Sequence, residues 1–245
     1  MSSIASLDKL PGFRRRFRIT PEARSVRAEV EDDFHCMSVT IHHDGVVATQ
    51  VEPAMTRGPW NTCPGAIAVL EATFTGVALR AFVKRGEKRS NCTHLHDLAL
   101  LAAAHAFDTR RLIYDILVSD PVDGIRTAEL RRNGTPVLGW TEAQGKLIEP
   151  AEVAGLSLDK LNPWIGSLGP QQQEAARLLR WGTMIAHGRS MMLGSQSDAT
   201  HMPTGNCYTF KPERMAVAKH TGQIREFSRG SAQPLDNHQL ADSVG

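Results

Sequence analysis

The chain has 245 residues, of which 41% are hydrophobic and 22% are charged, as in an ordinary folded globular protein. This balance excludes a disordered or collagen-like chain, and the length is sufficient for a hydrophobic core without disulfide bonds. The formal net charge is +2, but residues 1–30 carry seven basic and three acidic residues, so the remainder is slightly acidic.

The basic excess lies in one predicted strand, residues 13–20, in which arginines alternate with apolar side chains. A protein that binds nucleic acid needs a more extended basic face, so this pattern indicates a strand with one solvated face. No apolar run reaches the ~20 residues of a membrane-spanning helix, and residues 1–10 lack the apolar core of a secretory signal. We expect a cytoplasmic protein with reduced cysteines that binds neither nucleic acid nor membrane.

Residues 13–51 are predicted to be extended, with strands at 26–30 and 36–41. Asp44-Gly45 between two β-rich runs predicts a two-residue hairpin loop that pairs His43 with Val46. Side-chain alternation then places His35 on the more apolar face of its strand and Cys36 on the other.

Three predicted helices follow a loop at residues 52–61 that contains two prolines. The first begins after Cys63-Pro64, because proline suits the first helical turn. The second covers residues 77–84. The third covers residues 93–118, with Asn91 or Thr93 available as its cap and a leucine-rich apolar stripe.

Beyond residue 121 the pattern predicts strands at 125–132 and 135–141 around Asn133-Gly134, and a third at 146–148. A connector at 150–170 and helices at 171–192 and 212–220 follow. Strands followed twice by helices predict an α+β fold, with antiparallel β-hairpins packed against several helices. We expect a single domain, with a core at 1–150 and a helical C-terminal extension at 151–245 that completes a pocket.

The densest chemistry is the heptapeptide at residues 91–97, Asn-Cys-Thr-His-Leu-His-Asp, at the predicted start of the long helix. A helix N-terminus lowers the pKa of a thiol, and Cys63 begins another predicted helix, so we expect Cys63 and Cys92 to favour the thiolate. With His35 and His94 they form a candidate zinc ligand set. Because paired C-x-x-C motifs are absent, buried thiols and a capped helix start are the alternative.

His94 and His35 are the candidates for acid/base catalysis, because histidine exchanges protons near neutral pH. Asp97, three residues after His94, is placed to orient its ring. His94 and His96 lie about 200° apart on a helix, so only one of them faces a given pocket.

Four apolar or aromatic side chains are candidates for contacts with a small-molecule substrate. Two lie in the predicted helix 171–192 and two in the tail: Trp181, Met191, Tyr208 and Phe210. A purely structural strand at residues 204–210 is the alternative.

Four landmarks carry a family resemblance over residues 13–115. They are Phe34-His35-Cys36-Met37-Ser38-Val39, Cys63-Pro64-Gly65-Ala66, Gly76 and the Cys-Thr-His-Leu tetrapeptide at residues 92–95. The chain thereby resembles the bacterial domain of unknown function 2889 family, although Asn91 stands where a glycine usually precedes the motif.

The resemblance implies that His35, Cys63, Cys92 and His94 are the marked positions of the family, and it brings no assigned reaction. Longer relatives with a tail similar to residues 207–210 imply degradation of aromatic compounds. One implied activity is a lyase that releases formaldehyde from a lignin-derived aromatic dimer.

The leading hypothesis is therefore a lyase in which a histidine acts as general base on a small aromatic substrate with a hydroxymethyl side chain, with no required cofactor. The alternative is a non-catalytic module that is stabilised by zinc or binds a small ligand. Assembly into a homo-oligomer is left open.

Overall fold

The computed structural model describes residues 7–189, 198–230 and 232–236. The chain divides into two compact units, which we call the first unit (residues 1–16, 113–194 and 226–245) and the second unit (residues 17–112 and 195–225). Both combine antiparallel strands with helices, so the predicted α+β class is confirmed. The boundary predicted at residue 150 lies inside the first unit.

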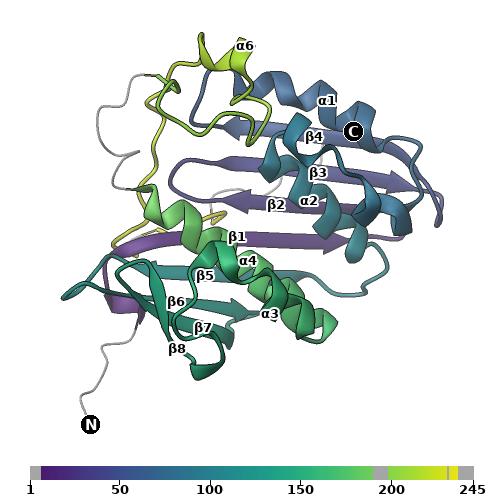
Figure 1. The fold of residues 1–245 in the computed structure, drawn as a ribbon. Helices are drawn as coiled ribbons and strands as arrows, with labels where there is room; N and C mark the ends of the chain where they lie inside the picture. The colour runs from purple at the N-terminus through teal and green to yellow at the C-terminus, as the bar shows by residue number, and fades with distance from the viewer. Residues whose placement is uncertain (1–6, 190–197, 231, 237–245) are drawn as a thin grey trace. The chain divides into compact units, whose positions relative to one another are not determined.

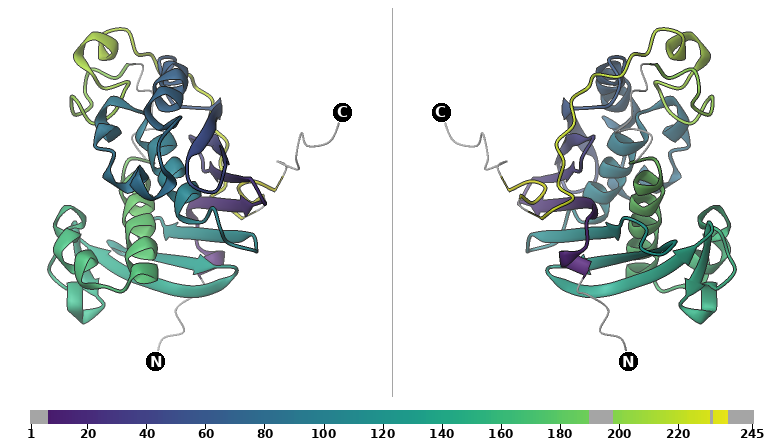
Figure 2. Two further views of the ribbon diagram at one scale, coloured as in Figure 1. Left: turned by 90° about the vertical axis from the view of Figure 1, so that its right-hand side faces the viewer. Right: turned by 90° about the vertical axis from the view of Figure 1, so that its left-hand side faces the viewer.

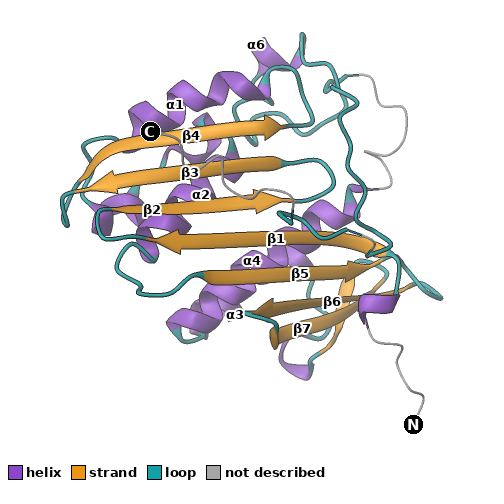
Figure 3. Cartoon of the chain, turned by 180° about the vertical axis from the view of Figure 1, so that it is seen from behind, coloured by secondary structure: helices purple, strands orange, loops and turns teal. Residues whose placement is uncertain are grey.

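The second unit contains the strands β2 (Ser25–Glu31), β3 (Cys36–His43) and β4 (Ala48–Arg57), and the later part of β1 (Gly12–Pro21). The strand order is β1-β2-β3-β4. The helices α1 (Ala66–Phe74) and α2 (Thr93–Ala104) pack against these strands, as Figure 1 shows. In Figure 3, seen from behind, the strands stand in front of both helices, so α1 and α2 cover the same face.

The hairpin between β3 and β4 differs from the predicted one. His43 pairs with Ala48 rather than with Val46, and residues 44–47 form a longer loop. Oδ1 of Asp44 accepts hydrogen bonds from the backbone N–H groups of Val46 and Val47, each at 2.8 Å, which closes the turn inside the loop. The loop predicted at residues 52–61 is also wrong over its first half, because β4 continues to Arg57.

Pro53 is compatible with β4 because this strand is the outermost in the order of the second unit. The connecting segments of the unit form short 3₁₀ helices at Cys63–Gly65, Leu79–Lys84 and Glu87–Ser90. The helix predicted at residues 93–118 is wrong beyond Ala104, because β5 (Leu112–Ser119) follows. Leu112, Tyr114 and Ile116 are buried at every second position, which is the period of a strand.

The first unit contains β6 (Ile125–Arg132), β7 (Thr135–Ala143) and β8 (Lys146–Glu149), in the order β1-β5-β6-β7-β8. Arg132 pairs with Thr135, so Asn133-Gly134 forms the predicted two-residue loop, with positive φ at both residues. This hairpin prediction is confirmed.

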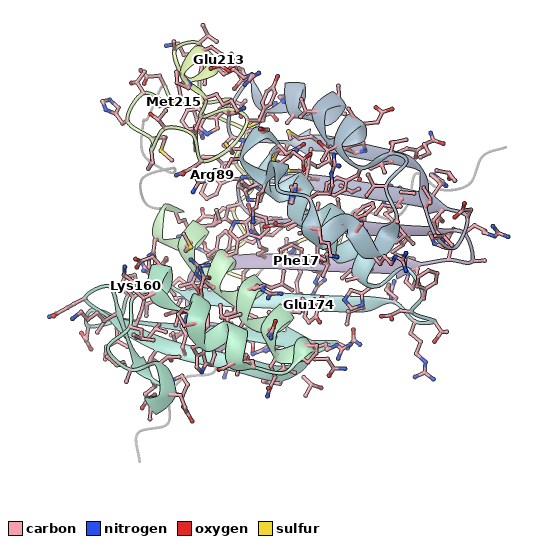
Figure 4. The ribbon with its side chains drawn as sticks, turned by 45° about the vertical axis from the view of Figure 1, so that its right-hand side comes forward. Phe17, Arg89, Lys160, Glu174, Glu213 and Met215 are labelled. Atoms are coloured by element: carbon pink, nitrogen blue, oxygen red, sulfur yellow. The ribbon has the colours of Figure 1, made fainter. Side chains whose placement is uncertain are left out.

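Two helices complete the first unit: α3 (Asn162–Ser167) and α4 (Pro170–His187). The α4 helix packs against β6 and β7 (Figure 2). Glu174 of α4, labelled in Figure 4, accepts a hydrogen bond of 2.6 Å from the hydroxyl of Tyr114. The predicted helix 171–192 is confirmed up to His187, and its last three residues lie outside the described ranges.

The tail of the second unit contains one short helix, α6 (Pro212–Met215), on which Figure 4 labels Glu213 and Met215. The helix predicted at 212–220 is therefore shorter than expected. Residues 204–210 form turns rather than a strand. No helix within the described ranges is both long and apolar enough to cross a membrane.

Candidate functional site

A hydrogen-bonded pair of side chains lies in the loop between β2 and β3. Nδ1 of His35 lies 3.0 Å from Oδ1 and 3.2 Å from Oδ2 of Asp32. The same Oδ1 accepts the backbone N–H groups of Phe34, at 2.8 Å, and of His35, at 2.9 Å. Because an ionised carboxylate only accepts hydrogen bonds, this contact assigns the proton to Nδ1 of His35 and leaves Nε2 as its basic nitrogen.

The ring of His35 is stacked on the ring of His94 in the first turn of α2. Their centroids are 3.8 Å apart and their planes differ by 25°. Both residues are buried, and α2 packs directly against β2 and β3. The fold therefore brings together the two histidines that the sequence nominated for acid/base chemistry.

One nitrogen of His35 remains available to a ligand. Nε2 forms no hydrogen bond with any residue in the described part of the chain, and 7% of the side chain is exposed. This arrangement, a carboxylate on one ring nitrogen and an unused second nitrogen, is that of an oriented general base.

Asp97, the predicted orienting carboxylate, lies elsewhere. It forms an ion pair with Lys88, and its Oδ1 lies 3.7 Å from Nδ1 of the neighbouring His96. Asp32 is not among the residues predicted from the sequence, although an aspartate three residues before a histidine in a short strand connection indicates such a contact.

The cysteines at the helix starts are buried rather than activated. Cys92 is the N-cap residue of α2, yet burial and the neighbouring Cys63 raise its pKa to about 12 despite hydrogen bonds from the helix backbone. Burial also raises the pKa of Cys63, whose Sγ lies 3.5 Å from Oγ1 of Thr209. The expectation that both favour the thiolate is wrong, because loss of solvation outweighs the helix N-terminus.

The ring geometry of the two histidines bears on the candidate zinc set. In a tetrahedral site two imidazole lone pairs meet at about 109°, whereas the rings of His35 and His94 lie face to face and nearly parallel. In the described ranges no three His, Cys, Asp or Glu side chains are arranged to bind a metal. As placed, His35 and His94 do not fit a shared zinc ion.

The tail at residues 207–210 docks beside the cysteines. The backbone N–H of Tyr208 donates to the carbonyl of Asn91 at 2.9 Å, and the hydroxyls of Thr209 and Thr62 are 3.1 Å apart. The guanidinium of Arg214 lies 3.9 Å from the centre of the Tyr208 ring, and the hydroxyl of Tyr208 lies against Gly65.

The four predicted substrate contacts are thus distributed over the chain. Phe210 packs edge-to-face on Trp60, with centroids 6.1 Å apart, in the same unit as Tyr208. Trp181 belongs to the first unit, where the guanidinium of Arg15 lies 5.0 Å from its ring centre. Met191 lies outside the described residues.

Comparisons with known proteins give no family for this chain. No family model matches it, and no curated protein does so either. A solved structure, described as a crystal structure of a viral glycoprotein, is 11% identical over 76% of this chain with a TM-score of 0.22. This chain spans 57% of that protein, and a likeness at this level carries no argument about fold or function.

Proposed function

We propose that the second unit carries the acid/base centre of a lyase, with His35 as general base, Asp32 as its orienting carboxylate and His94 as the second polar group at the reacting atoms. The observation that supports this proposal is the Asp32–His35 hydrogen bond, with the ring stacked on His94 and its Nε2 not hydrogen-bonded to any described residue. A buried carboxylate that fixes a histidine ring also stabilises the imidazolium formed when the base accepts a proton.

The proposed substrate is a small aromatic molecule in which the carbon that carries the hydroxymethyl group is bonded to a second carbon that carries an aryl ether. His35 removes the hydroxyl proton, the O–H electron pair forms the C=O bond of formaldehyde, and the C–C bond to the hydroxymethyl carbon breaks. The released pair forms a C=C bond as the aryloxide leaves. The aryloxide then takes up the proton, so the reaction is redox-neutral and requires no cofactor.

The aromatic character of the substrate is supported by the surroundings of the motif. Tyr208, Phe210 and Trp60 lie within the same unit as the histidine pair, and Tyr208 contacts the residue that precedes Cys92. Aromatic side chains supply the flat apolar surface against which a substrate ring packs.

The test is formaldehyde release from a lignin-type dimer with a hydroxymethyl side chain. We expect His35→Ala to lower kcat by about 10²- to 10⁴-fold, the usual contribution of a general base, and Asp32→Asn to lower it as well. His105→Ala is the matched control, because His105 is held by Asp108 at the far end of α2. Full turnover by His35→Ala would eliminate the proposal.

The non-catalytic alternative is a module that is stabilised by zinc at His35, Cys63, Cys92 and His94 or that binds a small ligand. The stacked arrangement of His35 and His94 argues against a shared zinc ion. Metal analysis of the purified protein separates this alternative from the lyase.

A further inference from the structure

The loop that carries Asp32 and His35 is held by an arginine from the neighbouring strand. Arg57, the last residue of β4, directs one guanidinium nitrogen, Nη2, at this loop. It donates to the backbone carbonyl of Asp32 at 2.6 Å and to Oε1 of Glu31 at 3.0 Å. A third acceptor, the carbonyl of His35, lies 3.4 Å away. Two of these acceptors lie in the connection between β2 and β3, and Glu31 is the last residue of β2.

These contacts are shielded from water. Glu31, Asp32 and Asp33 are fully buried, and the side chain of Arg57 is 13% exposed. Charge-assisted hydrogen bonds in such surroundings are stronger than exposed ones, and removal of one partner leaves a buried charge without compensation. Arg57 therefore compensates part of the buried negative charge of Glu31, together with Arg225.

A second arginine, from the tail of the second unit, also binds this loop. The backbone N–H of Arg225 donates to the carbonyl of Asp33 at 2.9 Å, and its guanidinium lies 3.4 Å from Oε1 of Glu31. Arg225 thus binds the loop at Asp33, whereas Arg57 binds the backbone carbonyl of Asp32, the residue whose carboxylate contacts His35.

Arg57 is linked to the imidazole of His35 through one residue, Asp32. The Asp32 carboxylate lies in the same residue as the carbonyl held by Arg57, and it accepts both backbone N–H groups at positions 34 and 35. If the Asp32 peptide rotated, the carboxylate would leave Nδ1 of His35. The orientation of the ring thus depends on a contact that does not involve the ring.

We propose that Arg57 is a positioning residue for His35, which acts by fixing the Asp32 peptide so that the Asp32 carboxylate meets Nδ1. The role of His35 as a general base rests on the proposed function. The positioning of its ring by Arg57 can be measured without substrate.

The experiment uses the full-length protein labelled with ¹⁵N and compares Arg57→Gln and Arg57→Lys with the wild type. Arg18→Gln is the matched control, because Arg18 is 16% exposed and pairs with the buried Glu29 at 2.6 Å in the same unit. Two signals are recorded by NMR: hydrogen exchange of the Phe34 and His35 amides, and the ring Nδ1–H resonance of His35.

In Arg57→Gln we expect the two amides to exchange at least about tenfold faster relative to amides of β2 and β3, and the Nδ1–H resonance to shift or disappear. Arg18→Gln keeps both signals. Arg57→Lys, which retains a charged nitrogen beside Glu31 but carries it on a more flexible stem, gives an intermediate effect. A folded Arg57→Gln with wild-type exchange and an unchanged ring resonance would overturn the proposal.

If Arg57→Gln does not fold, Arg57→Lys decides: faster exchange confined to the two amides supports positioning, and unchanged exchange contradicts it. In the formaldehyde assay we expect Arg57→Gln to lower kcat with KM unchanged. Full activity of His35→Ala would remove the lyase proposal while these NMR results still stand, so the two failures are distinguishable.

Discussion

At the scale of single residues, burial decides the chemistry of the cysteine motif. Cys92 occupies the N-cap position of α2, where the helix backbone favours a thiolate, and the hydrogen bonds from His94 and Leu95 act in that direction. The side chain is nevertheless buried, and the loss of solvation destabilises the thiolate more than the helix N-terminus stabilises it. The motif position alone therefore does not make a reactive cysteine.

Selective alkylation tests this conclusion. Burial raises the pKa of Cys92 to about 12 and that of Cys36 to about 11, so at pH 8 nearly all of both is thiol. We expect iodoacetamide to leave both unmodified in the folded protein and to react first at the partly exposed Cys207. Peptide mass spectrometry with a urea-unfolded control measures this, and equal rates at Cys92 and Cys207 would refute it.

A second residue-scale prediction concerns Glu142 in the first unit. Burial alone would raise its pKa, but the hydrogen bond from His187 at 2.6 Å and the charges of His187 and Arg126 lower it below the ordinary 4.5. A carboxyl whose pKa is lowered by folding stabilises the protein above its ordinary pKa, and that contribution is lost as the pH falls.

We expect Glu142→Gln to cost about 1 kcal/mol of unfolding free energy at pH 7, because it removes a buried carboxylate from the exposed His187 and the partly buried Arg126. The difference from wild type should shrink between pH 5 and pH 3. Urea unfolding followed by tryptophan fluorescence measures both quantities. The exposed Glu152→Gln serves as control, and a difference independent of pH would argue against the ion pair.

At the scale of elements, packing of α4 on β5 depends on one glycine. A Cβ at Gly182 would lie 2.7 Å from Cγ2 of Ile116, closer than side-chain atoms approach. We expect Gly182→Ala to destabilise the protein by about 1–3 kcal/mol through overpacking, although alanine is the better helix former. Thermal unfolding measures this change.

The control is Gly166→Ala in α3, where a Cβ meets no atom within 4 Å. That variant should be neutral or stabilised, since only helix propensity changes. Combining Gly182→Ala with Ile116→Ala should cost less than the sum of the two single changes, because each relieves the other. Strict additivity would show that the close approach is not the cause.

The elements also show where sequence reasoning succeeds. The Asn133-Gly134 hairpin is local, because two residues with positive φ define it, and it was predicted correctly. The Asp44-Gly45 hairpin is not local: the carbonyl of Val46 accepts the N–H of Leu79, and Val47 pairs with Ala78. A segment more than thirty residues away thus sets the loop length, and no local pattern contains that information.

The candidate site shows the same division. His35 and His94 were nominated from residue type and motif, and the packing of α2 on β3 brings them together. The role of Asp32 depends on the turn formed by residues 32–35, which the sequence pattern does not show. Arg57 reaches this turn because β4 is longer than predicted. The chemistry of individual residues can be predicted from the sequence, whereas their interaction partners are set by tertiary structure.

At the scale of the whole molecule, each unit is assembled from distant segments. Residues 207–225 return to the second unit, where Tyr208 joins Asn91 and Arg225 joins Asp33. In the first unit, Arg16 pairs with Asp115 and with Asp236 near the C-terminus. The tail is consequently part of the unit that carries the histidine pair. Removal of the tail would expose the loop at residues 32–35.

Metal removal is the whole-molecule test that separates the two functional hypotheses. The His35–His94 stack and the Asp32 and Arg57 contacts hold the second unit by direct hydrogen bonds and packing, so we expect a chelator to leave the melting temperature unchanged. Thermal unfolding with and without chelator, alongside elemental analysis of the untreated protein, makes the measurement. Near-stoichiometric zinc whose removal unfolds the chain would contradict this expectation, because binding energy at a structural zinc site is folding energy. Such a result would require the imidazole rings of His35 and His94 to leave the stacked arrangement.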